Sequence, residues 1–218
     1  MTNAVKIVVA HLTKGGSGKT TLACNIAVEV QRRGYSVALV DYDEDQQASI
    51  EFTTRRLEYG GLKEIDGYLT PTDKELTEIL SKYDIVVMDT GGYDLPSTQA
   101  LIALGDHVLI PSNINKHEIK ALESFAIKMI NISKITKRDL TPVIVPSRLN
   151  SKVTKTEAKE HFAPLLRHGY SIADPIYYRI AYQRCLDIGK GITEYKDKKA
   201  ELEIYNLINT LQNKGITA

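Results

Sequence analysis

The sequence predicts a doubly wound α/β fold, in which a mainly parallel sheet carries helices on both faces as a three-layer sandwich. Two observations support this prediction. Short apolar runs rich in β-branched residues alternate along the chain with segments whose apolar residues recur at helical spacing. The apolar runs are continuous rather than alternately polar, which is typical of parallel strands that helices cover on both sides.

The expected strands, in chain order, are residues 4–11, 36–41, 84–89, 107–111 and 141–146. A helix is expected over residues 20–33, because Leu22, Ile26 and Val30 recur at helical spacing and Gly34 ends the pattern. The remaining helices are expected near residues 47–58, 73–82, 96–104, 117–133, 153–166, 178–187 and 197–212. Because the sequence shows no repeat, low-complexity tract or linker, we expect residues 1–218 to form one domain.

The N-terminal residues lack the basic region, apolar stretch and cleavage site of a secretory signal. No apolar run approaches the roughly 18 residues of a membrane-spanning helix. We therefore expect a cytoplasmic protein. The two cysteines, Cys24 and Cys185, agree with a reducing compartment, and Cys24 is expected to be a small buried thiol within the first helix.

The net charge of +1 conceals a difference between the two halves of the chain. Residues 1–110 hold 10 Lys and Arg against 16 Asp and Glu, whereas residues 111–218 hold 18 against 11. The basic second half is the candidate surface for an anionic partner, nucleic acid first and anionic membrane second. Charge spread over several solvated helices is the alternative explanation.

A glycine-rich phosphate-binding loop, KGGSGKTT, joins the first strand to the first helix at residues 14–21. Its glycines permit backbone conformations in which successive N–H groups point at phosphate oxygens, and the helix N-terminus adds its positive end. In such a loop Lys19 reaches the β- and γ-phosphates of ATP and the Thr20 hydroxyl ligates Mg²⁺. The nucleotide is therefore expected against Gly15, Gly16, Ser17, Gly18, Lys19, Thr20 and Thr21. The general pattern would have a glycine at Thr13, and this chain has a second lysine, Lys14, beside it.

Two of the predicted strands end in acidic residues, at Asp41-Tyr42-Asp43-Glu44-Asp45 and at Asp89. Ligands of doubly wound sheets bind beyond the carboxyl ends of the strands, so both acidic tips are expected to face the phosphates. Carboxylates beside a triphosphate imply metal binding and the positioning of water. We assign Asp89 to Mg²⁺ directly or through water, Asp41 to a supporting position at the metal, and Asp43 to the attacking water. A helix N-cap is the alternative for Asp43 and Asp45.

Four ordered segments, KGGSGKTT, VALVDYDED, VVMDTGG and HVLIPS, resemble the deviant Walker A ATPases of the ParA/MinD superfamily. The segment from Ile188 to Tyr195 is also similar to the GKPIIEY stretch of ParA-type partition proteins. The resemblance covers nearly the whole chain and implies a P-loop ATPase that uses ATP and Mg²⁺. It also implies that two ATP-bound subunits pack face to face, with Lys14 reaching the phosphates of the partner subunit and Asp43 as the catalytic aspartate.

The resemblance further implies that the ATP-bound homodimer holds DNA or membrane, and that a ParB-like or other adaptor protein stimulates hydrolysis. One departure is that D-x-D-E-D-Q-Q stands where family members commonly read D-x-D-P-Q. This version is similar to a ParA-related protein of T-DNA transfer in agrobacteria and to some small plasmid partition ATPases, so an accessory ATPase of conjugative DNA transfer is an alternative. The chain starts at its first strand, so the N-terminal helix-turn-helix of larger ParA proteins is not expected.

A plasmid or chromosome partition ATPase would bind DNA nonspecifically and associate with the nucleoid. Such binding needs only neutralisation of phosphates by basic residues. The candidates are Lys152, Lys155, Lys159, Arg179, Arg184 and Lys190. By position and family likeness, Arg148 and Asn150 are candidates for contact with adenine or ribose.

A MinD-like membrane switch would need a C-terminal amphipathic helix with a basic polar face. The helix near residues 197–212 mixes acidic and basic residues on its polar side, so we expect it to dock on the domain instead. An iron–sulfur carrier would need clustered cysteines, and an amide ligase would normally work without a lysine that crosses between subunits. Both metabolic alternatives are therefore disfavoured.

Overall fold

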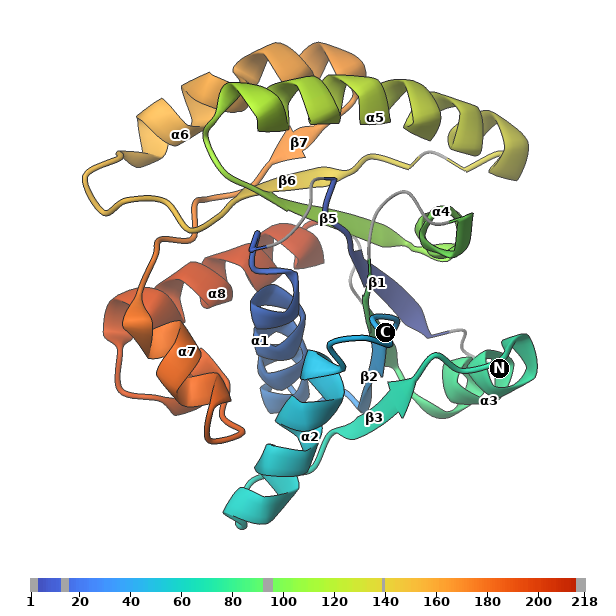
Figure 1. Ribbon diagram of the computed structural model, residues 1–218, viewed down its shortest axis with the longest axis vertical. Coiled ribbons are helices and arrows are strands. Elements are labelled where there is room, and N and C mark those ends of the chain that lie inside the picture. The colour runs from blue at the N-terminus through green and yellow to red at the C-terminus, as the bar shows by residue number, and fades with distance from the viewer. Residues whose placement is uncertain (1–3, 13–15, 92–95, 139, 215–218) are drawn as a thin grey trace.

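The computed structural model describes residues 4–12, 16–91, 96–138 and 140–214, so Lys14, Gly15 and Gly92 lie outside the described residues. A seven-stranded sheet with strand order β3-β2-β4-β1-β5-β6-β7 runs through it, and every neighbouring pair is parallel (Figure 1). The strands are β1 (Val5–Val9), β2 (Val37–Asp41), β3 (Asp66–Leu69), β4 (Ile85–Asp89), β5 (His107–Ser112), β6 (Val143–Pro146) and β7 (Ser171–Ile172).

The α-helices are α1 (Lys19–Arg32), α2 (Ala48–Tyr59), α3 (Asp73–Lys82), α4 (Pro96–Leu104), α5 (Lys116–Thr136), α6 (Lys155–Phe162), α7 (Ile180–Leu186) and α8 (Lys198–Gln212). Two short 3₁₀ helices, η1 (Ala163–His168) and η2 (Ile192–Glu194), complete the described structure. No helix among the described residues is long and apolar enough to cross a membrane.

Helices cover both faces of the sheet, which confirms the predicted three-layer α/β fold (Figure 1). Helices α1, α2, α7 and α8 pack on one face, and α3, α4, α5 and α6 pack on the other. Successive residues of β1 enter opposite layers, since Ile7 and Val9 join the first core and Val8 joins the second. The central strands are therefore apolar along their length, as the continuous runs predict.

Both edge strands, β3 and β7, lie outside the expected set. Strand β3 consists of Asp66-Gly67-Tyr68-Leu69 and is mostly exposed, so it carries no apolar run. Strand β7 has only two residues. These two edge strands form because they pair with a neighbouring strand, and not because of an apolar pattern in their own sequence. The helix expected over 153–166 is also divided, because α6 ends at Phe162 and η1 follows.

Candidate functional site

Strands β1, β2 and β4 are neighbours, and their carboxyl ends meet at the phosphate-binding loop. In the strand register Asp89 lies beside both Val9 and Asp41, so the two predicted acidic tips are adjacent. The loop enters α1 through two glycines with left-handed backbones, Gly16 (φ 75°) and Gly18 (φ 89°). A side chain at either position would be strained, which is the physical reason for glycine there.

Asp89 is the buried centre of this edge, with 1% of its surface exposed. Its Oδ2 accepts hydrogen bonds from Thr20 Oγ1 at 2.6 Å and from Ser49 Oγ at 2.8 Å. Its Oδ1 is also buried but has no hydrogen-bond partner among the described residues. Burial raises the pKa of Asp89 to about 6 although both hydroxyl donors act in the opposite direction.

This donor set fits Mg²⁺. A hard cation takes carboxylate and hydroxyl oxygens together with several waters. Asp89 offers an unsatisfied carboxylate oxygen, and the Thr20 hydroxyl lies 2.6 Å from its other oxygen. A buried carboxylate oxygen without a partner is costly, and an ion or a metal-bound water would satisfy it.

Asp41 holds the loop that follows β2. Its Oδ1 accepts from the Asp43 amide and its Oδ2 from the Ser49 amide, each at 2.9 Å. Burial raises its pKa despite these hydrogen bonds. Both carboxylate oxygens of Asp41 already accept hydrogen bonds from the backbone. Asp41 therefore orders the segment after β2, which carries the half-buried Asp43. The Asp43 carboxylate accepts from the Gln46 amide at 3.1 Å.

Two residues of this edge were not among the expected site residues. Ser49, on α2, joins both acidic tips, because its amide binds Asp41 and its hydroxyl binds Asp89. His11 directly follows β1 and its ring Nδ1 lies 3.0 Å from the Pro111 carbonyl oxygen. Burial, and then the positive charge of Lys19, lowers the pKa of His11 to about 4. In the sequence, only the nearness of Ser49 to the acidic residues 41–45 points to a role at the site. Only the position of His11 just before the phosphate-binding loop points to it.

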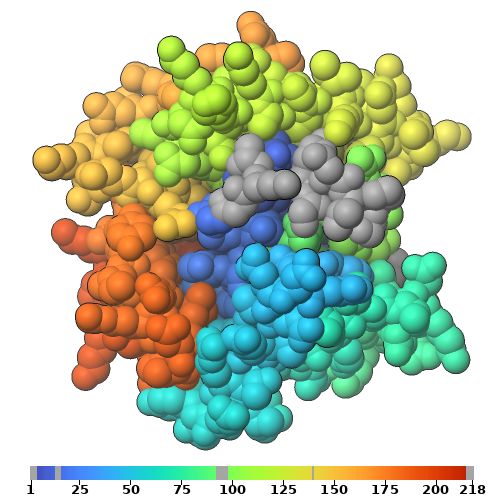
Figure 2. Space-filling model, in the orientation of Figure 1, coloured from blue at the N-terminus to red at the C-terminus, as the bar shows by residue number. Residues whose placement is uncertain are grey.

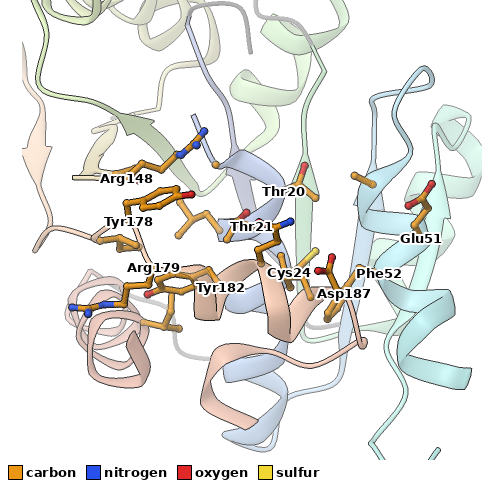
Figure 3. Close-up of a pocket in the computed structure, with 18 of the residues that line it drawn as sticks. Thr20, Thr21, Cys24, Glu51, Phe52, Arg148, Tyr178, Arg179, Tyr182 and Asp187 are labelled. Carbon is orange, nitrogen blue, oxygen red and sulfur yellow. The ribbon is translucent and has the colours of Figure 1, made fainter. Parts of the chain in front are cut away.

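A cavity of about 430 Å³ opens beside the N-terminal turns of α1 (Figure 3). Thr20, Thr21 and Cys24 of α1 lie along it, and Arg148 and Tyr178 come from segments after β6 and before α7. On the molecular surface the blue N-terminal segment lies between α2, in cyan, and the orange segment that contains α7 (Figure 2). Because Gly18, Thr20 and Thr21 line the cavity, it continues from the phosphate-binding loop.

Arg148 and Asn150, the two candidates for contact with the base or ribose, occupy different places. Arg148 has a left-handed backbone (φ 55°), its guanidinium donates to the Gly16 carbonyl, and it lies 5.6 Å from the centre of the Tyr178 ring. Asn150 is exposed, is not among the residues that line the cavity, and accepts a hydrogen bond from the Lys152 amide at 3.0 Å. The structure thus brings Arg148, and not Asn150, to the cavity.

Most candidate DNA-binding residues have partners within the protein. Lys155 and Lys159 each lie 2.8 Å from an oxygen of Asp174. Arg179 pairs with Glu203 at 2.6 Å, and Lys190 donates to the Tyr59 hydroxyl at 2.8 Å. Lys152 and Arg184 are exposed and form no ion pair within the described part of the chain.

Residues 8–192 match the CobQ/CobB/MinD/ParA nucleotide-binding domain. The chain belongs to this family. It is a P-loop ATPase of the ParA/MinD family, with the fold and the strand-end carboxylates described above. The protein ParA of Rhizobium radiobacter is 20% identical to it over 201 residues, which are 90% of this chain and 89% of the relative.

Solved structures of the family have the same fold. A McdA variant of Cyanothece in complex with ATP superposes with a TM-score of 0.76 at 16% identity, over 97% of this chain and 98% of McdA. The MinD cell division protein of Aquifex aeolicus gives 0.72 at 19% identity, over 98% of this chain and 99% of MinD. At these low identities the TM-scores show a shared fold and nothing beyond it.

Proposed function

We propose that this ATPase hydrolyses ATP with Mg²⁺, forms a homodimer when ATP is bound, and positions plasmid or chromosomal DNA. The observation that supports this most strongly is the contact of Thr20, Ser49 and Asp89 at the end of the phosphate-binding loop. The hydroxyl and carboxylate oxygens at this contact are of the kind that bind Mg²⁺, and they lie at the acidic end of β4 beside the phosphate-binding loop. The likeness to a ParA protein and to McdA bound to ATP supports the same proposal.

In this proposal Thr20 and Asp89 hold the metal ion, which would neutralise phosphate charge during transfer. Gly16, Ser17, Gly18, Lys19 and Thr21, together with Gly15 outside the described residues, bind the phosphates. Asp41 fixes the backbone of the segment after β2, so that the Asp43 carboxylate can orient the attacking water. Lys14 would reach the phosphates of the partner subunit, which couples hydrolysis to dimerisation.

The C-terminal helix favours DNA over membrane as the partner surface. Ile204, Leu207, Ile208 and Leu211 of α8 are at most 1% exposed and pack in the core with α1. A helix that binds a bilayer would need this apolar face at the surface. The basic second half of the chain would instead neutralise DNA phosphates, with Lys152 and Arg184 as the first residues to test.

The nucleotide part of the proposal is tested by light scattering of Asp43→Ala and Lys19→Ala with ATP and with ADP. We expect Asp43→Ala to form a stable dimer with ATP that does not turn over, because water is no longer oriented. We expect Lys19→Ala to lose nucleotide and stay monomeric. A monomeric Asp43→Ala protein that binds ATP would contradict the face-to-face dimer.

The partner is tested by co-sedimentation with plasmid DNA and, in parallel, with anionic vesicles, each with ATP and with ADP. We expect capture by DNA alone and only with ATP. The double variant Lys152→Ala/Arg184→Ala should weaken capture and lower its salt dependence while ATP turnover without DNA is unchanged. Lys74→Ala, which removes an exposed lysine from α3 in the acidic first half of the chain, is the control for loss of positive charge. Capture by vesicles instead would support the membrane alternative.

A further inference from the structure

Helix α5 carries three large apolar side chains on its outer surface. Ile127, Ile130 and Ile135 are 65%, 47% and 82% exposed. The opposite side of the same helix packs into the core through Leu122, Phe125, Ala126 and Met129. Because the core contacts already anchor α5, its exposed isoleucines are not needed for folding. Ile127 and Ile130 are three residues apart and therefore neighbours on the helix surface, and exposed apolar residues that lie together in this way mark interaction sites.

The C-terminal half of α5 and the residues directly after it are basic. Residues 124–138 contain Lys128, Lys134, Lys137 and Arg138 and no acidic residue, and the acidic residue that precedes them, Glu123, lies 3.8 Å from Arg167. Arg138 is used within the protein, where it lies 2.7 Å from Asp106. The three lysines are exposed. We call Ile127, Ile130, Ile135, Lys134 and Lys137 the α5 surface.

A groove of about 370 Å³ lies beside the α5 surface, between the C-terminal half of α5 and residues 140–142 and 168–170. Its described lining includes Ile130, Lys134 and His168 beside apolar and uncharged polar residues, and it contains no Asp or Glu. A groove of this size accommodates one or two large apolar side chains of a partner. Figure 1 shows α5 along the top of the molecule and α7, which carries Arg184, at its lower left.

We propose that the α5 surface binds an acidic amphipathic helix of a partner protein. A helix can place apolar residues in the groove and against Ile127 and Ile130, while its acidic flanks face Lys134 and Lys137. DNA would gain nothing from exposed isoleucines. A bilayer would not fill a groove, and three isoleucines on a docked helix bury little in lipid. The proposal goes beyond ATP-dependent DNA positioning, because the surface is complete in one subunit without nucleotide.

The test uses a fluorescein-labelled helical model peptide with leucines at helical spacing and glutamates on both flanks, and a version with lysines in place of the glutamates. Fluorescence anisotropy with the full chain and no nucleotide should show binding of the acidic peptide, about tenfold or more tighter than of the basic peptide. The double variant Ile127→Ser/Ile130→Ser should weaken binding of the acidic peptide by about tenfold or more. Leu202→Ser, on α8 and 55% exposed, is the matched control and should bind as the parent does.

Charge reversal separates docking from general stickiness. Lys134→Glu/Lys137→Glu should reverse the preference, so that the basic peptide binds more tightly than the acidic one. All the substituted side chains are exposed, so thermal unfolding should match the parent and exclude misfolding as the cause. No binding of the acidic peptide below roughly 1 mM, equal binding by the α5 variants, or α5-dependent capture by anionic vesicles would overturn the proposal. None of these outcomes depends on ATP, DNA or dimerisation.

Discussion

Replacement of Glu194 by alanine tests how strongly the C-terminal segment is fixed to α2. The Glu194 carboxylate accepts two hydrogen bonds from Arg56, at 2.7 and 2.8 Å, and one from the Gly191 amide at 3.1 Å. Arg56 is 1% exposed and also donates to the carbonyl of Gly189. The substitution would leave a buried guanidinium without its counter-ion.

Removal of one partner from a buried ion pair costs about 3–5 kcal/mol, because the remaining charge stays desolvated. Arg56 keeps its hydrogen bonds to the carbonyls of Lys63 and Gly189, so we take the lower end, about 3 kcal/mol. For a chain of this length, that corresponds to a fall in Tm of about 6–12 °C. Urea unfolding and calorimetry of Glu194→Ala measure both quantities.

The adjacent arginine on the same helix provides the control. Arg55 pairs with Glu51 at 2.7 Å, but their side chains are 42% and 58% exposed. Glu51→Ala should therefore change the free energy of unfolding by no more than about 0.5 kcal/mol. Equal effects of Glu51→Ala and Glu194→Ala would refute the argument that burial makes the second pair important.

The pair also gives a pH dependence. Burial raises the pKa of Glu194, but the hydrogen bonds and charge of Arg56 outweigh this and hold the pKa below its ordinary value. A lowered folded-state pKa contributes stability that is present above the unfolded pKa of about 4.3 and is lost as the pH falls through the folded value. The stability difference between the parent and Glu194→Ala should therefore shrink below about pH 4. If the difference in stability stayed constant as the pH fell, packing rather than charge would be its cause.

Burial raises the pKa of Asp89 to about 6, so the stability linked to its protonation is present below about pH 4 and lost as the pH rises through about 6. Without magnesium and near neutral pH, Asp89→Asn should be more resistant to urea than the parent by roughly 1–3 kcal/mol, with a smaller difference in acid. Gly189→Ala should destabilise by about 3 kcal/mol or more, since its backbone is left-handed and a Cβ would collide with the backbone nitrogen of Arg56; a thermal melt like the parent's would exclude this close approach. Cys24 and Cys185 are buried, and burial raises the pKa of each thiol, so a thiol reagent should label them only after denaturation.

The central strands of the fold and the carboxylates at the expected metal site are predictable from the sequence, because both depend on local patterns. Continuous apolar runs specify β1, β2 and β4, and the residue that ends a buried strand must lie at the carboxyl edge of the sheet. Asp41 and Asp89 are therefore adjacent once β2 pairs with β4. The glycine spacing likewise places Thr20 at the start of α1, where it meets Asp89.

Features that depend on packing between distant segments are not predictable in this way. Ser49 is one of many serines until the geometry of α2 directs it at both Asp41 and Asp89. Tyr178 precedes a short helix, and only the fold brings it beside Arg148 at the cavity. Strand β3 has Asp66 and Gly67 in half of its length and exists through pairing with β2.

Counting charges along the sequence likewise cannot identify the surface that binds a partner. The second half of the chain has a net excess of basic residues, but tertiary pairing decides which of them face a partner. Arg179 is largely neutralised by Glu203, and one carboxylate, Asp174, binds both Lys155 and Lys159. A phosphate must compete with those contacts, whereas an exposed lysine without a carboxylate neighbour gains a full ion pair on binding. Basic surfaces that attract partners should therefore be sought where acidic residues are missing from the neighbourhood, as around Lys134 on α5, rather than where lysines are most numerous.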